Sequence, residues 1–126
     1  MPVLTEPPRM GDVLKYEVNP NYTREAIPLL MGLPYPAGAV LGKITASGKY
    51  TLSTAAGADG AETAVAVLLY AVDATLADAT GIVVARGPAI VSRAGLAYDG
   101  SVDDAAKITA KVAQLAARGI IARDGA

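Results

Sequence analysis

Residues 64–72 read Ala-Val-Ala-Val-Leu-Leu-Tyr-Ala-Val, a run that contains no charged residue. If this run forms a strand, Val65, Val67 and Leu69 share one face of its pleat, and the residues between them share the other face. Both faces are apolar, which predicts a strand that is covered on one side by the chain's own core and on the other by a further layer or subunit. Residues 82–85 have the same character.

Shorter strand patterns surround this run. Residues 39–45 and 49–53 are two strand candidates, and Ser47-Gly48 between them favours the turn of a hairpin. Residues 89–92 follow the bend at Arg86-Gly87-Pro88 and continue as a further strand, whereas residues 55–62 are rich in Ala, Gly and Asp and predict a loop. The pattern predicts a mixed α/β fold that is mainly β, with a small body of hairpins and short strands.

The C-terminal part of the chain predicts one helix, at about residues 102–118. Ser101 is a suitable N-cap, and Asp103 and Asp104 would lie in the first turn, where the helix dipole favours acidic side chains. Gly119 is placed to adopt the left-handed conformation that ends a helix. Residues with i, i+4, i+7 spacing form one apolar stripe: Ile108, Val112 and Leu115.

Proline placement predicts an extended N-terminal arm. Seven of the eight prolines lie in the first 36 residues, and only Pro88 lies beyond them. Proline fixes φ and removes a backbone donor, so this region cannot form a long helix or a central strand. We therefore expect an arm at residues 1–16 and a single β-rich domain at residues 17–126. Residues 12–17 and 24–30 could be short strands, the second demoted to an edge or interrupted by Pro28.

Composition argues against several classes of protein. The 126 residues have the length of one domain. The net charge of -1 and the scattered Lys and Arg residues argue against binding to nucleic acid. No stretch approaches the roughly 20 apolar residues that a membrane-spanning helix needs, and the first six residues do not resemble a signal peptide. We expect a soluble chain that is not exported and has no membrane or nucleic-acid partner.

The sequence predicts neither catalytic residues, nor a metal site, nor a cofactor. Without Cys and His, the commonest nucleophile, general base and transition-metal ligands are missing. The adjacent pair Asp103 and Asp104 fits helix capping better than paired-carboxylate catalysis. Asp73 and Asp78 could bind a hard cation, but loop carboxylates without a ligand pattern are more often simply solvated.

Three other features leave alternatives open. Lys43 and Lys49 could be buried amine nucleophiles, although isolated lysines near strand ends are usually solvated. Tyr16, Tyr22 and Tyr35 could anchor the proline-rich region on a partner or pack it onto the domain. A small β-rich module that binds a ligand or a glycan is an alternative function, but such modules usually present a platform of aromatic side chains, and this chain has no Trp.

Several segments, in this order along the chain, resemble the lambda-type bacteriophage head decoration proteins. They are Pro8-Arg-Met-Gly-Asp-Val-Leu14, Tyr22-Thr-Arg-Glu25, Pro36-Ala-Gly-Ala-Val-Leu-Gly-Lys-Ile44 with Gly48-Lys-Tyr50, Ala71-Val-Asp-Ala-Thr75, Val84-Ala-Arg-Gly-Pro-Ala-Ile90, and Leu115-Ala-Ala-Arg-Gly-Ile-Ile-Ala-Arg123. The resemblance covers nearly the whole chain, and it depends on the order and spacing of these segments because none is specific alone. The proline-rich entry is somewhat longer here, and the loops are richer in alanine.

The resemblance implies a structural protein rather than an enzyme. It implies a homotrimer that binds the major capsid protein at three-fold positions outside an expanded head and stabilises the shell against the pressure of the packaged DNA. The protein would be located on the outer surface of the virion and, before assembly, in the host cytoplasm. The residues expected in the capsid-binding arm are Pro2, Val3, Leu4, Thr5, Glu6, Pro7, Pro8, Arg9, Val13, Leu14 and Tyr16. The residues expected at the trimer interface are Val67, Leu69, Ile82 and Val84.

Overall fold

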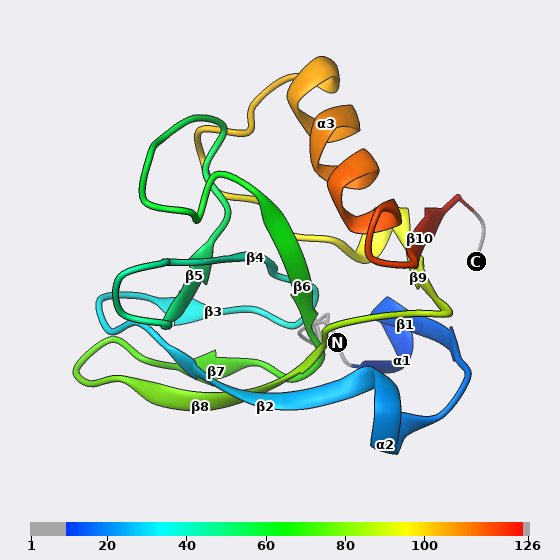
Figure 1. Cartoon of the computed structure of the whole chain (residues 1–126), viewed down its shortest axis with the longest axis horizontal. Helices are drawn as coiled ribbons and strands as arrows, with labels where there is room; N and C mark the ends of the chain where they lie inside the picture. Colours follow the sequence, from blue (N-terminus) through cyan, green and yellow to red (C-terminus); the bar gives the residue numbers. More distant parts are fainter. Residues whose placement is uncertain (1–9, 125–126) are drawn as a thin grey trace, which may run out of the picture.

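The computed structural model describes residues 10–124, and its centre is a closed five-stranded barrel (Figure 1). Around the barrel the strand order is β2-β5-β4-β6-β8. The barrel strands are β2 (Arg24–Leu29), β4 (Val40–Lys43), β5 (Tyr50–Leu52), β6 (Ala64–Leu68) and β8 (Ala79–Val84). The predicted class, mixed α/β and mainly β, is confirmed.

A second layer lies against one side of the barrel. It consists of a three-stranded sheet, in the order β1-β9-β10, and the helix α3 (Ala105–Ala116). β1 (Leu14–Glu17) runs antiparallel to β9 (Ala89–Ser92), and β10 (Ile120–Arg123) runs parallel to it. In Figure 1, α3 lies beside β6 and β10, at the opposite side of the picture from β7 (Val72–Asp73), which forms a two-stranded sheet with β3 (Pro34–Tyr35).

The strand β6 is covered on both faces, but by layers of its own chain. Val67 and Leu69 belong to a core cluster that also contains Leu115 of α3 and Ile120 of β10. Ala66 and Leu68 belong to a second cluster, inside the barrel. The register between β4 and β6 shifts between Leu41 and Gly42, so the strict alternation of faces is broken at the start of β6. The expected further layer is therefore intramolecular.

The long apolar run ends as a strand earlier than predicted. β6 stops at Leu68, and Tyr70 and Ala71 are exposed before Val72–Asp73 forms the separate short strand β7. The predicted hairpin is present as β4 and β5, with Gly48 at φ +74° in its turn. The bend at Gly87-Pro88 is also present and contains a cis peptide bond.

Pro28 does not interrupt its strand. β2 pairs with β8 along all six of its residues, from Arg24 opposite Val84 to Leu29 opposite Ala79. On its other side β2 pairs with β5 only at Leu29 and Tyr50. The pairing of β2 with β5 therefore involves few backbone hydrogen bonds. A proline, which has no N–H to donate, is tolerated in a strand with such a sparsely paired edge.

The helix α3 is shorter than predicted because its cap is Asp104. The Asp104 carboxylate accepts a hydrogen bond from the Lys107 backbone N–H at 2.8 Å. Ser101, the predicted cap, instead accepts a hydrogen bond from the Ala55 N–H at 2.9 Å and so ties down the loop after β5. Gly119 has the predicted left-handed φ, at +81°. The residues directly after it form the strand β10.

The described residues begin with a helix and a strand that lie within the range expected for the arm. Met10–Val13 forms the short helix α1, and β1 follows it directly and pairs with β9. Val13 is completely buried in the core cluster, and Met10 packs against that cluster. Residues 10–16 therefore belong to the body, and residues 1–9 of the predicted arm lie outside the described residues. A further short helix, α2 (Pro20–Thr23), connects β1 to β2, and a 3-10 helix, η1 (Arg93–Gly95), follows β9.

Gly38 is required where the chain crosses Gly95. Its φ is +90°, and a Cβ built on it would lie 2.0 Å from the Gly95 carbonyl oxygen. Gly38→Ala is expected to lower the free energy of unfolding by about 3 kcal/mol, since backbone strain and a backbone clash act together. Gly48→Ala is the matched control: its φ is also positive, but the nearest atom to its Cβ would be 3.9 Å away. In urea unfolding, Gly48→Ala should lower the free energy of unfolding by about 1 kcal/mol. Equal losses of free energy for the two variants would contradict the proposed clash of the added Cβ with Gly95.

Candidate functional site

The predicted arm residues fall into two groups. Pro2, Val3, Leu4, Thr5, Glu6, Pro7, Pro8 and Arg9 lie outside the described residues. Val13 is fully buried in the core of the single chain. Leu14 is half-buried and packs against the same cluster, whereas Tyr16 on β1 is 52% exposed. Among the described residues of the predicted arm, Tyr16 is the one large apolar side chain that remains available for binding.

The four residues predicted at the trimer interface differ in exposure. Val67, Leu69 and Val84 are completely buried in the core of the single chain. These three side chains point into the layer between the barrel and α3, which sequence periodicity alone cannot distinguish from a subunit interface. Ile82 is 36% exposed and lies opposite Ala26 on the outer face of β2 and β8. Ile82 is the member of the set that can still contact another molecule.

Exposed apolar side chains gather at the corner between β1 and β2. Tyr16, Val18 and Tyr22 are 52%, 51% and 57% exposed. They belong to β1, to the turn after it and to α2, which begins with Asn19 capping the Asn21 N–H at 2.9 Å. An apolar group held by a capped turn is a suitable contact surface because little conformational freedom is lost on binding. We call Tyr16, Val18 and Tyr22 the corner patch.

Glu17 stabilises the elements that carry the corner patch. Its carboxylate accepts hydrogen bonds from the Thr23 hydroxyl at 2.6 Å and from Arg24 Nη2 at 2.5 Å, and its side chain is only 8% exposed. Burial alone would raise the pKa of Glu17, but the hydrogen bonds from Arg24 and Thr23 outweigh this effect, so its pKa lies below the ordinary 4.5. Glu17 therefore joins β1, α2 and β2 as a carboxylate.

The Glu17 contacts predict an acid-sensitive contribution to stability. Because the folded-state pKa is lowered, the contribution is present above pH 4.5 and is lost as the pH falls through the folded-state pKa. Glu17→Gln is expected to cost about 2 kcal/mol of unfolding free energy at pH 7 and to give a flatter dependence between pH 7 and 3. Glu25→Gln, which removes an exposed pair with Arg86, is the control and should cost less. An unchanged pH slope in urea titrations of Glu17→Gln would contradict this role.

Arg86, which follows β8, also contacts the residues at this corner. Its guanidinium donates to the Tyr22 carbonyl oxygen at 2.5 Å, pairs with Glu25, and lies 5.5 Å from the centre of the Tyr22 ring. A guanidinium over an aromatic face is attracted by the ring's quadrupole. Tyr22 therefore has one ring face occupied, and Tyr35 is buried. These two tyrosines do not offer the free rings that a glycan platform would need.

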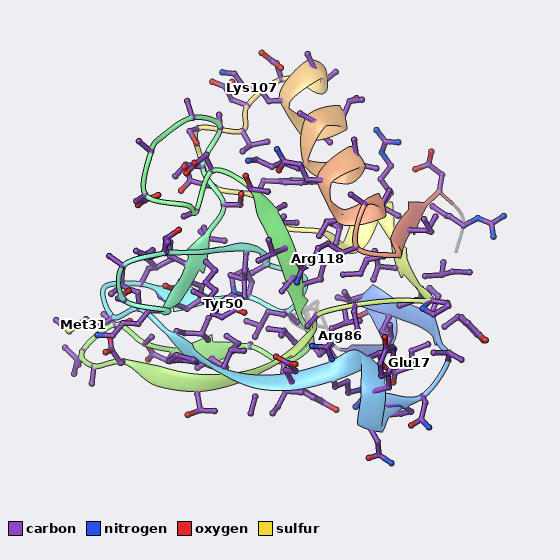
Figure 2. The ribbon with its side chains drawn as sticks, viewed as in Figure 1. Glu17, Met31, Tyr50, Arg86, Lys107 and Arg118 are labelled. Carbon is purple, nitrogen blue, oxygen red and sulfur yellow. The ribbon has the colours of Figure 1, made fainter. Side chains whose placement is uncertain are left out.

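A second exposed apolar group lies at the far end of β2. Met31 follows β2 and is 55% exposed, and Leu76, in the loop between β7 and β8, is 92% exposed. The Gly32 N–H donates to the Ala74 carbonyl, and the Met31 N–H donates to the Asp78 carboxylate at 2.8 Å. Figure 2 shows Met31 at one end of the molecule and Glu17 toward the other. We call Met31 and Leu76 the tip patch.

The carboxylates considered as cation ligands have other partners. Asp78 pairs with Lys49 at 2.6 Å, and Asp73 accepts from the Thr75 N–H and hydroxyl. The Lys49 hydrogen bond and the Met31 N–H lower the pKa of Asp78, and Thr75 lowers that of Asp73. Within residues 10–124, no group of three acidic side chains is arranged to hold a metal ion. No helix in that range is long and apolar enough to cross a membrane.

The buried amine is Lys111 of α3, not Lys43 or Lys49. Lys111 is 2% exposed, and its Nζ donates to the carbonyl oxygens of Thr54 and Glu62, each at 2.5 Å. Burial lowers its pKa. The side chain holds both ends of the loop at residues 54–62 against the helix, a structural role. A sequence signal exists, since Lys111 lies between Ile108 and Leu115 on the same stripe of the helix.

An apolar groove of about 470 Å³ runs beside the small sheet of β3 and β7. It is lined by residues 34–37 and 71–73, which include two prolines and Tyr35, the latter held by a hydrogen bond from its hydroxyl to the Leu30 carbonyl at 2.6 Å. Sequence patterns did not predict the groove, since it depends on pairing between strands of two residues each.

A comparison with known families identifies a family that matches most of the chain. The family model described as bacteriophage lambda head decoration protein D matches residues 3–120. The matched range contains the barrel, the strands β1 and β9 and the helix α3, and it ends at the first residue of β10. A search of curated proteins finds no match.

Proposed function

The chain belongs to the bacteriophage lambda head decoration protein D family, and from this premise we propose that it binds the outside of the expanded head as a trimer at three-fold positions. The family supports a role in capsid decoration, a place on the virion and a structural rather than catalytic function. The single observation that carries the proposal is the match across residues 3–120 of 126. The partner is the major capsid protein, and the consequence of binding is a shell that withstands the internal pressure of DNA.

The arrangement of the body supports a role as a rigid clamp. Barrel, second sheet and α3 share core clusters, so forces applied at one patch are transmitted through packed side chains. The corner patch precedes β2 and the tip patch follows it, and a six-residue strand spans about 20 Å. Two apolar contact points at this separation suit a protein that bridges neighbouring subunits of a shell.

Residues 1–9 supply the attachment arm in this proposal. An extended segment can add backbone hydrogen bonds to the edge of a partner's sheet, although each bond contributes only about 0.5–1.5 kcal/mol. Three arms on one trimer act together, because after the first has bound the others are held at high effective concentration. Weak single contacts thereby become durable attachment.

Before assembly, the protein would reside in the host cytoplasm.

Binding to bare expanded heads tests the arm. The two proteins to compare are the full chain and a variant that begins at Met10, which retains the whole described body. We expect the full chain to pellet with the heads and the shortened chain to bind at least a hundred-fold more weakly, because its backbone donors and acceptors are removed. Circular dichroism must show that the shortened chain is folded. Equal binding by both would contradict the arm, and binding by neither would contradict decoration itself.

The outer face of β2 and β8 is the surface we propose for contact between copies. Ile82 is exposed there beside Ala26, and Pro28 and Thr80 form the next exposed pair. Small side chains and few charges allow two such faces to approach closely. This surface replaces the buried residues Val67, Leu69 and Val84 as the candidate interface.

A further inference from the structure

The outer face of the β1-β9-β10 sheet carries a row of apolar side chains. Ile90 of β9 lies opposite Tyr16 of β1 on one side and opposite Ile121 of β10 on the other. Tyr16 and Ile121 are exposed, and Ile90 between them is partly exposed. Residues that lie opposite one another in a sheet share a face and touch across the strands. The three side chains therefore form one continuous row, which we call the sheet row.

The sheet row does not contribute to the core of the chain. The residues that alternate with it point to the other face of the sheet, where Val91 belongs to the core cluster and Leu14 and Ala122 pack against it. A sheet with one face on the core usually presents polar side chains on the other face. Contiguous exposed apolar side chains instead mark a surface for binding.

The charge beside the sheet row is positive. Arg123 lies two residues after Ile121 in β10, so both side chains are on the same face, and Arg123 is exposed. Within residues 10–124, Arg123 forms no ion pair. The carboxylate of β1, Glu17, is on the opposite face and is paired with Arg24. An arginine without a partner beside apolar side chains fits a protein surface that presents a carboxylate beside an apolar patch.

The position of the sheet row in the chain indicates which protein supplies that surface. The described chain begins with α1, which directly precedes β1 and contacts both β1 and β9. Figure 1 shows α1 together with β1, β9 and β10 on one side of the molecule. The residues before Met10, which we propose as the attachment arm, therefore join the body at an edge strand of this sheet. A protein bound by that arm is held close to the sheet row.

From these observations we propose that the sheet row and Arg123 bind an apolar patch with an acidic rim on the capsid protein. The inference rests on the proposed function and deepens it, because it assigns a second contact to the folded body beside the arm. Tyrosine and arginine are enriched among the residues that dominate binding energy at protein interfaces.

Binding of full-length variants to bare expanded heads tests this surface. Ile121→Glu places a carboxylate in the sheet row and is expected to weaken binding at least ten-fold, because the change is repeated in every copy of a bound trimer. Ala110→Glu introduces the same side chain at an exposed position of α3 and should leave binding unchanged. Arg123→Gln should weaken binding and reduce its dependence on salt, whereas Lys43→Gln, which removes an exposed cation from β4, should change neither.

The outcomes separate this inference from the proposed function. Unchanged binding by both Ile121→Glu and Arg123→Gln would overturn the inference and leave decoration intact, whereas failure of the unaltered chain to pellet would overturn both. Loss of a trimer that the unaltered chain forms in solution would assign the sheet row to contacts between copies and would also overturn it. Circular dichroism checks that each variant is folded, and Tyr16→Ala, which only shortens an exposed side chain, replaces Ile121→Glu if that variant unfolds. Weaker binding by a folded variant with an unchanged oligomeric state supports the proposal.

Discussion

Leu69→Asp is expected to unfold the chain, not to release folded single copies from a trimer. Leu69 is completely buried between the barrel and α3, in the cluster that contains Leu115 and Ile120. A carboxylate there would lose its hydration without gaining a partner, at a cost of about 5 kcal/mol or more. Since a small domain is stable by only about 5–15 kcal/mol, circular dichroism at 25 °C should show loss of most or all of the folded protein.

Ile82→Asp is the matched control for this substitution. It introduces the same side chain on the neighbouring strand β8, but at a position that is 36% exposed. We expect the chain to remain folded and, if the outer face of β2 and β8 joins copies, to sediment as single chains. A Leu69→Asp protein that is soluble and folded would show that the described packing of this layer is wrong.

Lys111→Ala is expected to have the second largest effect. The ammonium group is the donor for the Thr54 and Glu62 carbonyls, and truncation leaves both without it. Each unsatisfied buried carbonyl costs about 1–3 kcal/mol, and loss of the packed aliphatic stem adds to this. Removal of a buried cation recovers part of its desolvation cost, so we expect a net loss of about 3 kcal/mol in urea unfolding.

The control for Lys111 lies one turn earlier on the same helix. Lys107 is exposed and pairs with Asp103 at 2.8 Å, so Lys107→Ala should change stability little. Amide hydrogen exchange supplies a second measurement: Lys111→Ala should accelerate exchange in residues 54–62, whereas Lys107→Ala should not. Equal exchange in that loop for both variants would contradict the anchoring role of Lys111.

Local patterns in the sequence were sufficient for much of the fold. The hairpin of β4 and β5 and the strand β6 follow from apolar runs and the Ser47-Gly48 turn. The end of α3 follows from Gly119. In each case the signal lies within a few residues of the element that it predicts.

Features that depend on distant pairing were not predictable in this way. β10 is a strand only because Ile120–Arg123 finds β9 as a parallel partner about thirty residues away in sequence. The cover over β6 looks the same in sequence whether it comes from α3 or from a second subunit. For this reason Val67, Leu69 and Val84 were assigned to an interface, although they fill the chain's own core.

The candidate site was predictable only in part for the same reason. Tyr16 and Ile82 were identified from sequence and are exposed, whereas Val13 follows the proline-rich segment and gives no local sign that it enters the core. The corner and tip patches also depend on contacts such as Glu17 with Arg24 and Met31 with Asp78, which join different elements. An ion pair or a hydrogen bond between distant residues has no sequence spacing that would reveal it.

We propose above that the chain decorates a phage head as a trimer at three-fold positions. Saturation binding to bare expanded heads, with bound protein counted after sedimentation, tests it most directly. We expect a plateau at three copies for each three-fold position and no comparable binding to unexpanded heads. Failure to pellet with expanded heads, or a plateau that is not a multiple of three per position, would contradict it.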